Sequence, residues 1–224
     1  MKTILTDARS RKQRALSEYD SKRVIAAAGV PVSREALTNT KDEALAAAAE
    51  LGYPVVLKGC ADTLLHKTEK NMVFLNLASP DDVGDAYDRI TGAGEPLDGV
   101  LVQEQVRGGR ELVIGMVRDP QFGPCVMFGL GGVFTEVLRD TTFRVAPLSR
   151  EDAAEMLDEV KARALLDAFR GQPAVDREAL IDALVGIGAL ALENDEIAEI
   201  DINPIIVAGD RPVAVDAVVV LRRE

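Results

Sequence analysis

Apolar and polar residues in the first hundred positions follow helical and strand-like spacings in turn. Thr40 stands three residues before Glu43, which is the spacing of a capping box at the start of a helix. Ser79-Pro80 also favours a helix start, because proline at the first helical position loses no needed hydrogen bond. Continuous apolar runs indicate strands. The predicted elements are helices over residues 17–29, 44–51 and 79–91, and strands over residues 53–58 and 72–77.

A glycine-rich polar segment, residues 92–99, predicts a boundary between two subdomains. Strands are expected after it, and Arg107-Gly-Gly-Arg110 is typical of a hairpin turn between two of them. The predicted domains are an N-terminal extension over 1–16, a first subdomain over 17–98 and a second over 99–224. The later elements are predicted as strands over 99–106, 111–117, 125–128 and 134–138, helices within 150–194, and a terminal strand pair over 197–207 and 212–221.

Composition narrows the class of protein. With 224 residues, 47% of them hydrophobic, the chain can bury a substantial core. A net charge of −11 argues against a nucleic-acid partner. The basic stretch Arg9–Arg14 is interpreted as a solvated lead-in. Two cysteines, Cys60 and Cys125, and the lack of a signal-peptide or membrane-length apolar run predict a cytoplasmic protein without membrane contact.

The only histidine, His66, follows the strand that ends at Lys58. A neutral imidazole can act as a nucleophile or carry a proton near neutral pH, and the neighbouring Lys67 would favour a negatively charged group that it attacked. On these residues alone, a surface histidine in a polar loop is the better interpretation. The surrounding motifs have to decide between the two interpretations.

The end of the chain predicts a group of oxygen ligands. If Gly209-Asp210 forms a two-residue turn, counting back along the hairpin places Asn203 opposite Asp216. Asp201 shares the strand face of Asn203, because side chains alternate with period two. Oxygen donors without histidine or cysteine suit Mg²⁺ held together with phosphate. The alternative is that Asn203-Pro204 marks a bulge or strand end and that Asp216 is solvated.

A second candidate site is the glycine-rich segment Phe128–Gly132. Gly131 and Gly132 could let backbone amides approach a phosphate, although a plain tight turn is the simpler interpretation. The segment fits neither the dinucleotide fingerprint nor the mononucleotide loop. Glu136 and Arg144 follow and supply a carboxylate and a guanidinium, either for a metal and a phosphoryl group or for an ordinary surface ion pair.

The ordered set of motifs resembles one family. The motifs are Ser17–Lys22, Gly29–Val32, Pro54–Lys58, His66-Lys67, Val102–Glu104, Arg110-Glu111, Asp119–Pro124, Met127–Gly132, Phe143–Pro147 and Glu199–Pro204. Together they look like the ATP-grasp domain of ADP-forming acyl-CoA synthetases, from about Ser17 to the end of the chain. The resemblance implies an α+β fold in which two subdomains grip a nucleotide. It also implies that this chain corresponds to the β subunit of enzymes that are split into two chains, such as acetate–CoA ligase.

The resemblance also implies roles for individual residues. Lys22 and Lys58 match residues at the ATP phosphates, and Gln103, Glu104, Gln105 and Val106 match the adenine cleft. Glu111, Gly131 and Gly132 are expected beside the nucleotide as well. Asn203 and Asp216 match magnesium ligands, with Asp201 nearby. His66 matches the histidine that passes a phosphoryl group to ADP, with Glu136 and Arg144 as supporting charges.

The implied reaction is acyl-CoA + ADP + phosphate ⇌ carboxylic acid + CoA + ATP, through an acyl phosphate and a phosphohistidine. The chain contains no convincing CoA-binding unit, so this acid–thiol ligase would need a CoA-binding α subunit, separate or fused. Asn71-Met72 replaces the glycine that is common after the histidine in this family. Two alternatives stay open: another ATP-grasp carboxylate ligase that uses no phosphohistidine, and a catalytically silent nucleotide-binding subunit.

Overall fold

The computed structural model describes residues 1–62, 72–131 and 140–222, in two compact units. The smaller unit comprises residues 15–19 and 33–105, and the larger unit comprises residues 1–14, 20–32 and 106–224. The units therefore divide between Gln105 and Val106. The sequence predicts a boundary between the two nucleotide-binding subdomains at residues 98–99, and that boundary stays a prediction.

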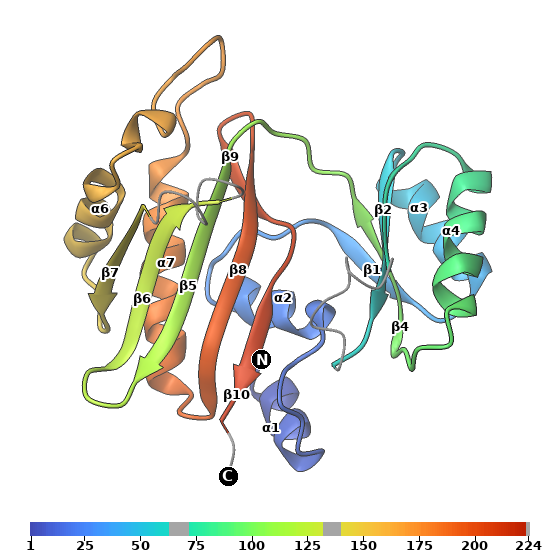
Figure 1. Cartoon of the computed structure of the whole chain (residues 1–224), viewed down its shortest axis with the longest axis horizontal. Helices are drawn as coiled ribbons and strands as arrows, with labels where there is room; N and C mark the ends of the chain where they lie inside the picture. The colour runs from blue at the N-terminus through green and yellow to red at the C-terminus, as the bar shows by residue number, and fades with distance from the viewer. Residues whose placement is uncertain (63–71, 132–139, 223–224) are drawn as a thin grey trace. The chain divides into compact units, whose positions relative to one another are not determined.

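The smaller unit is a four-stranded antiparallel sheet with two helices on one face (Figure 1). Its strand order is β1-β4-β2-β3. Apolar side chains of β2 and β4, such as Leu57 and Val102, pack with both helices into the core. The elements are β1 (Glu35–Thr38), α3 (Lys41–Leu51), β2 (Val55–Cys60), β3 (Val73–Leu77), α4 (Pro80–Gly92) and β4 (Gly99–Glu104).

Both helices of this unit begin at the caps that the sequence predicts. The Thr40 hydroxyl accepts the Glu43 backbone N–H at 3.2 Å. Ser79 and Asp82 form a full capping box, in which each side chain accepts the other residue's backbone N–H. These side chains satisfy amides that the first helical turn leaves without partners, and so they fix where each helix starts.

The larger unit is built on a six-stranded sheet with the order β10-β8-β5-β6-β7, and β9 pairs with β8. All its pairings are antiparallel. Its elements are α1 (Lys2–Ser10), most of α2 (Glu18–Ala27), β5 (Glu111–Asp119), β6 (Gly123–Leu130), β7 (Thr141–Val145), α6 (Arg150–Glu159), a 3₁₀ turn (Arg163–Leu165), α7 (Arg177–Glu193), β8 (Ile197–Ala208), β9 (Arg211–Ala214) and β10 (Val218–Leu221).

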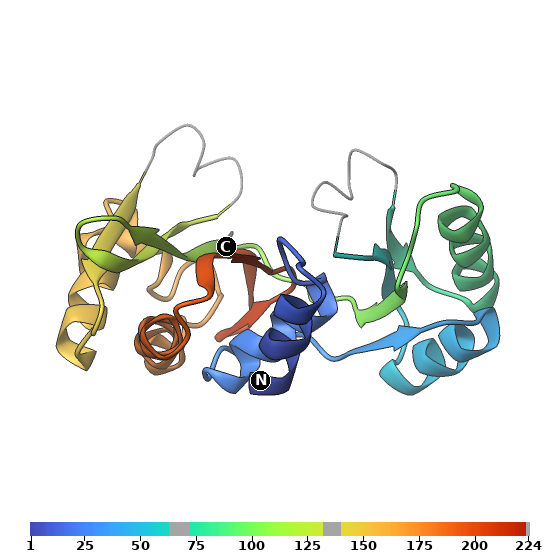
Figure 2. The ribbon, with the colours of Figure 1, turned by 90° about the horizontal axis from the view of Figure 1, so that it is seen from below.

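Helices α6 and α7 pack on one face of the larger sheet (Figure 2). Alternate residues of β8 show the consequence: Ile200 and Ile202 are buried, whereas Asp201 and Asn203 are exposed. The exposed residues therefore lie on the sheet face away from α7, where polar chemistry is available. The predicted α+β class is confirmed in both units.

Some sequence predictions for the middle of the chain are wrong. The segment Arg107–Arg110 does not join a hairpin, because β4 and β5 belong to different sheets. Gly108 is needed there for another reason: a Cβ atom would lie 2.1 Å from the Val207 carbonyl oxygen. Gly129 is part of β6 and not of a turn. The strand predicted over 134–138 lies outside the described residues.

The N-terminal segment is folded through helix α1, and the cationic side chains of its stretch Arg9–Arg14 are exposed, as expected of a solvated stretch. Leu5 and Ala8 of α1 are 1% and 2% exposed. At the end of the segment, the Arg14 carbonyl accepts the Leu221 backbone N–H at 2.8 Å. Burial of these apolar residues stabilises the segment against the rest of the larger unit.

Candidate functional site

Lys58 forms a buried ion pair in the smaller unit. Its Nζ lies 2.7 Å from Oε1 of Glu18, and the two residues are 6% and 2% exposed. Glu18 opens α2, where the helix dipole favours a carboxylate. A buried charge needs a partner of opposite sign, so Glu18 holds the Lys58 ammonium in a defined place on the sheet.

The same face of this sheet carries further residues predicted to bind the nucleotide. Lys58 pairs across the strands with Leu101, and Val56 pairs with Gln103, so all four side chains share the face opposite α3 and α4. Gln103 is only 2% exposed. The face therefore presents a buried ammonium and a buried amide, which are groups that can bind phosphate and a base.

The end of β4 is fixed by hydrogen bonds within the smaller unit. The Glu104 carboxylate accepts the Arg34 backbone N–H and Nε–H, both at 2.8 Å. Oε1 of Gln105 accepts the Asn76 backbone N–H at 2.8 Å. Val106 is the first residue of the larger unit in this part of the chain. Glu104 and Gln105 are thus held as a structured strand end, and their adenine role stays a prediction.

The terminal hairpin of the larger unit has the predicted register. Ala208 pairs with Arg211, so Gly209-Asp210 is the turn. The ladder runs to Ile205 opposite Ala214 and resumes with Asp201 opposite Val218. This register places Asn203 opposite Asp216, within residues 215–217 that are not strand. The predicted juxtaposition therefore follows from the observed pairing on both sides.

The alternative interpretation, that Asn203-Pro204 marks a bulge or a strand end, is correct for the bulge only. Both residues lie inside the continuous strand β8, so they do not mark a strand end. The pairing of β8 with β5 does shift at this point, between the Leu112–Ile205 and Ile114–Ile202 pairs. The irregularity is a bulge in β8, which has Asn203 and Pro204 where β5 has only Val113, and bulges commonly redirect side chains beside functional sites.

Asp201 lies among negative charges. Burial of its carboxyl group, together with the smaller effects of the negative charges of Glu199 and Asp216, raises the pKa of Asp201 to about 6, although part of the residue is exposed. Two carboxylates and an amide on one face form an oxygen donor set of the kind that Mg²⁺ prefers. No group of three His, Cys, Asp or Glu residues suited to a metal occurs within 1–62, 72–131 and 140–222, and the magnesium role of Asp201, Asn203 and Asp216 stays a prediction.

Lys22 of α2 lies beside the hairpin in the larger unit. It is 1% exposed, and its Nζ donates to the Val215 carbonyl oxygen at 3.4 Å. The preceding residue, Ser21, accepts the Val219 backbone N–H at 3.1 Å through its hydroxyl group. Helix α2 therefore brings a lysine to the residue next to Asp216, and the phosphate role of Lys22 stays a prediction.

Glu111 and Gly131 are in contact. The Gly131 backbone N–H donates to the Glu111 carbonyl oxygen at 2.7 Å. A Cβ atom at Gly131 would lie 2.9 Å from the Glu111 carbonyl carbon, so this close approach requires glycine. The two residues thus form one structural feature at the end of β6, and their nucleotide-binding role stays a prediction.

Arg144 is held by carboxylates of α6. Its guanidinium lies 2.6 Å from Glu159 and 3.4 Å from Glu155. Hydrogen bonding to Glu159, which outweighs the opposing effect of burial, raises the pKa of Arg144. Arg144 therefore forms ion pairs with α6, and the pair with Glu136 that the simpler interpretation predicted stays a prediction. His66, Glu136 and Gly132 lie outside the described residues.

Sequence reasoning missed Glu18, the partner of Lys58. The two residues are 40 positions apart, and neither periodicity nor a motif connects them. The available signal was an acid at the first turn of a predicted helix, but that pattern is common and indicates only a favourable helix start.

Comparison with known proteins gives these features a context. A family model described as an ATP-grasp domain matches residues 7–221. This chain belongs to the ATP-grasp family. The resemblance stated from the sequence and the predicted ATP-grasp fold are therefore confirmed.

Relatives of this ATP-grasp chain include named ligases. The β subunit of acetate–CoA ligase (ADP-forming) I from Pyrococcus furiosus is 42% identical over 216 residues, covering 94% of this chain and 93% of that protein. Acetate–CoA ligase (ADP-forming) I from Archaeoglobus fulgidus is 41% identical over 90% of this chain, which matches 30% of that longer protein.

A solved structure shows the same fold over nearly the whole chain. It is acetyl-coenzyme A synthetase 1 of Ca. Korarchaeum cryptofilum in complex with coenzyme A and Mg-AMPPCP, with its phosphohistidine segment pointing towards the nucleotide-binding site. Its sequence is 45% identical, its TM-score is 0.87, and the match covers 98% of this ATP-grasp chain and 99% of that one. Among the described residues, none of the helices is both long and apolar enough to cross a membrane.

Proposed function

We propose that this chain is the nucleotide-binding β subunit of an ADP-forming acyl-CoA synthetase, an acid–thiol ligase that acts with a CoA-binding α subunit. The observation that carries the proposal is the match of 42% identity over 93% of a protein that is itself named as such a β subunit. The buried Lys58–Glu18 pair and the oxygen donors around Asp216 support it, because phosphoryl transfer depends mainly on positioning and charge neutralisation.

In this proposal both units carry residues that bind the nucleotide. Lys58 and Gln103 of the smaller unit bind phosphate and base, and Lys22 of the larger unit binds phosphate. Asp201, Asn203 and Asp216 hold Mg²⁺, which would neutralise phosphate charge as the phosphoryl group moves. ATP and ADP are the nucleotides expected from the family.

The chemistry is proposed to pass through His66. The α subunit converts acyl-CoA and phosphate to CoA and an acyl phosphate. A ring nitrogen of His66 attacks the phosphorus, the bond to the acyl oxygen breaks, and the carboxylate leaves. An ADP β-phosphate oxygen then attacks the phosphohistidine, which restores the free imidazole and forms ATP. Glu136 and Arg144 are proposed as supporting charges. We also propose a cytoplasmic location, in keeping with the free thiols Cys60 and Cys125.

The test is the complete ligase reaction with purified α subunit, acetate, CoA, ATP and Mg²⁺, followed by thioester formation. Lys58→Met is expected to lower kcat/KM for ATP at least 100-fold, because it removes a buried phosphate-binding charge. Lys41→Met is the matched control, since Lys41 is an exposed lysine of the same unit, and it should keep wild-type activity. Unchanged turnover in Lys58→Met would favour a catalytically silent subunit.

A further inference from the structure

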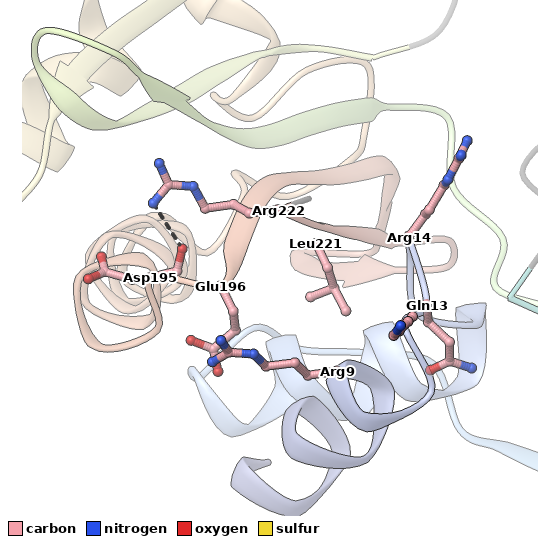
Figure 3. Close-up of a pocket in the computed structure, with 8 residues that line it drawn as sticks. Arg9, Gln13, Arg14, Asp195, Glu196, Leu221 and Arg222 are labelled. Atoms are coloured by element: carbon pink, nitrogen blue, oxygen red, sulfur yellow. Dashed lines mark hydrogen bonds between the residues drawn. The ribbon is translucent and has the colours of Figure 1, made fainter. Parts of the chain in front are cut away.

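A cavity of about 650 Å³ lies in the larger unit, and its lining includes none of the residues proposed to bind nucleotide (Figure 3). Its lining comes from the N-terminal segment, from Asp195 and Glu196 before β8, and from Leu221 and Arg222 at the end of β10. Four of its lining residues are cationic, namely Arg9, Lys12, Arg14 and Arg222. This basic cavity has no role in the proposed reaction.

The framework of the basic cavity is fixed by backbone contacts. The Leu221 N–H donates to the Arg14 carbonyl oxygen, and the Arg222 N–H donates to the Glu196 carbonyl oxygen, both at 2.8 Å. Helix α1 is anchored by its buried residues Leu5 and Ala8. The backbone that carries the cationic side chains is therefore already ordered, so the binding of a ligand costs little backbone conformational entropy.

Positive charge exceeds negative charge around the cavity. The acidic lining residues are Asp195 and Glu196, and the Asp195 carboxylate also lies 3.4 Å from the Arg118 guanidinium. Arg222 contacts the backbone carbonyl of Asp195, at 3.4 Å, as the dashed line in Figure 3 shows. The whole chain carries a net charge of −11, so this concentration of cations opposes the overall field. Such a surface attracts an acidic partner.

The lining favours a protein segment over a small molecule. Small-molecule pockets are mostly apolar or aromatic. Here Leu221 is the one apolar lining residue, and the lining includes no aromatic ring on which a base could stack. The cationic side chains are exposed at the rim. Exposed arginine and lysine side chains match the carboxylates of a facing protein surface.

Longer relatives indicate which protein would face this surface. In the Archaeoglobus fulgidus ligase the matched domain is 30% of the chain. The remaining part of that protein must leave the matched domain near one of its ends. In the present structure both the first helix and the last strand border the basic cavity. A further domain joined to either end of this ATP-grasp domain would therefore start beside the basic cavity.

We propose that the basic cavity docks an acidic segment of the CoA-binding α subunit. This inference rests on the proposed function, because it presupposes that the α subunit exists. Arg14 and Arg222, on opposite sides of the cavity, attract the acidic segment during encounter, and the rigid rim sets its position.

The test is the rate of association between the chain and the α subunit from the same organism, co-expressed and then separated. The double variant Arg14→Glu/Arg222→Glu should lower the association rate constant at least tenfold at 50 mM NaCl, change the dissociation rate constant much less, and flatten the salt dependence. Arg14→Gln/Arg222→Gln should give an intermediate rate. Lys161→Glu/Arg211→Glu, which places the same charge changes at exposed positions elsewhere in the unit, should behave as wild type.

Two results would overturn the inference. One is an unchanged association rate and salt slope in the glutamate double variant, with its fold verified by circular dichroism. The other is calorimetric binding of pyrophosphate that the double variant loses while α-subunit association stays intact, which would identify a small-anion site. If the wild-type chain fails to bind the α subunit at any salt concentration, the proposed function itself fails. ATP binding to the isolated chain should be equal in wild type and all three double variants.

Discussion

The buried Lys58–Glu18 pair allows a quantitative prediction. Two unit charges 2.7 Å apart attract by about 6 kcal/mol at an effective dielectric constant of ~20. Desolvation of both groups cancels much of this attraction, but the removal of one partner leaves the other charge buried. Glu18→Gln and Lys58→Met are therefore each expected to lower the free energy of unfolding by about 3–5 kcal/mol.

The double variant Glu18→Gln/Lys58→Met should lose far less than the sum of the two single losses, because neither charge is then left alone. We expect a coupling energy of at least about 2 kcal/mol from the double-mutant cycle. The assay is urea denaturation of all four proteins at pH 7, followed by circular dichroism.

Lys41 and Asp88 provide a control pair with the same separation. Their Nζ–Oδ2 distance is also 2.7 Å, in the same unit, but both side chains are exposed. The corresponding cycle with Lys41→Met and Asp88→Asn should give a coupling within experimental error, because solvent screens exposed pairs. If the buried pair shows no larger coupling than this exposed pair, burial does not set the strength of the interaction and the reasoning is refuted.

Two further predictions concern the larger unit's stability and packing. Gly186→Ala should lower the free energy of unfolding by roughly 1–3 kcal/mol or more, because the new Cβ atom would lie 1.8 Å from the Ala28 carbonyl oxygen. Gly92→Ala is the control, because no atom lies within 4 Å of its Cβ position, and it should be neutral or slightly stabilising in the same denaturation assay. Asp201 should destabilise the fold as pH rises from about 4 to about 6, because its folded-state pKa is raised to about 6 and the folded state binds the proton more tightly than the unfolded state. Asp201→Asn should remove this part of the pH dependence, so that in the presence of EDTA its urea midpoint exceeds that of wild type at pH 7 but not at pH 4. An equal difference at both pH values would contradict the assignment.

Local signals in the sequence were sufficient for much of the fold. Side-chain caps at Thr40 and Ser79 act within a few residues, so helix starts could be read directly. The Gly209-Asp210 turn fixed the register of the terminal hairpin over many residues, because one turn type sets all pairings that follow it. The opposition of Asn203 and Asp216 could therefore be derived before the structure was known.

Features that depend on distant contacts could not be predicted. Gly108 suggested a hairpin turn, but its role is to let the chain pass close to Val207, which is far away in sequence. The Glu18–Lys58 pair and the packing of α1 are also contacts between separate segments. Met72 is fully buried in the core of the smaller unit, where its side chain packs as an apolar residue. Such roles follow from tertiary structure and have no local signature.

The most direct test of the proposed function is phosphate transfer to His66. The chain, its α subunit, Mg²⁺ and ATP labelled at the γ-phosphate should give a label on this chain that acid removes and base does not. His66→Ala should abolish the label, whereas Lys161→Ala should retain it. Persistence of the label in His66→Ala, or ATP-dependent thioester formation with no labelled histidine, would contradict a reaction that passes through phosphohistidine.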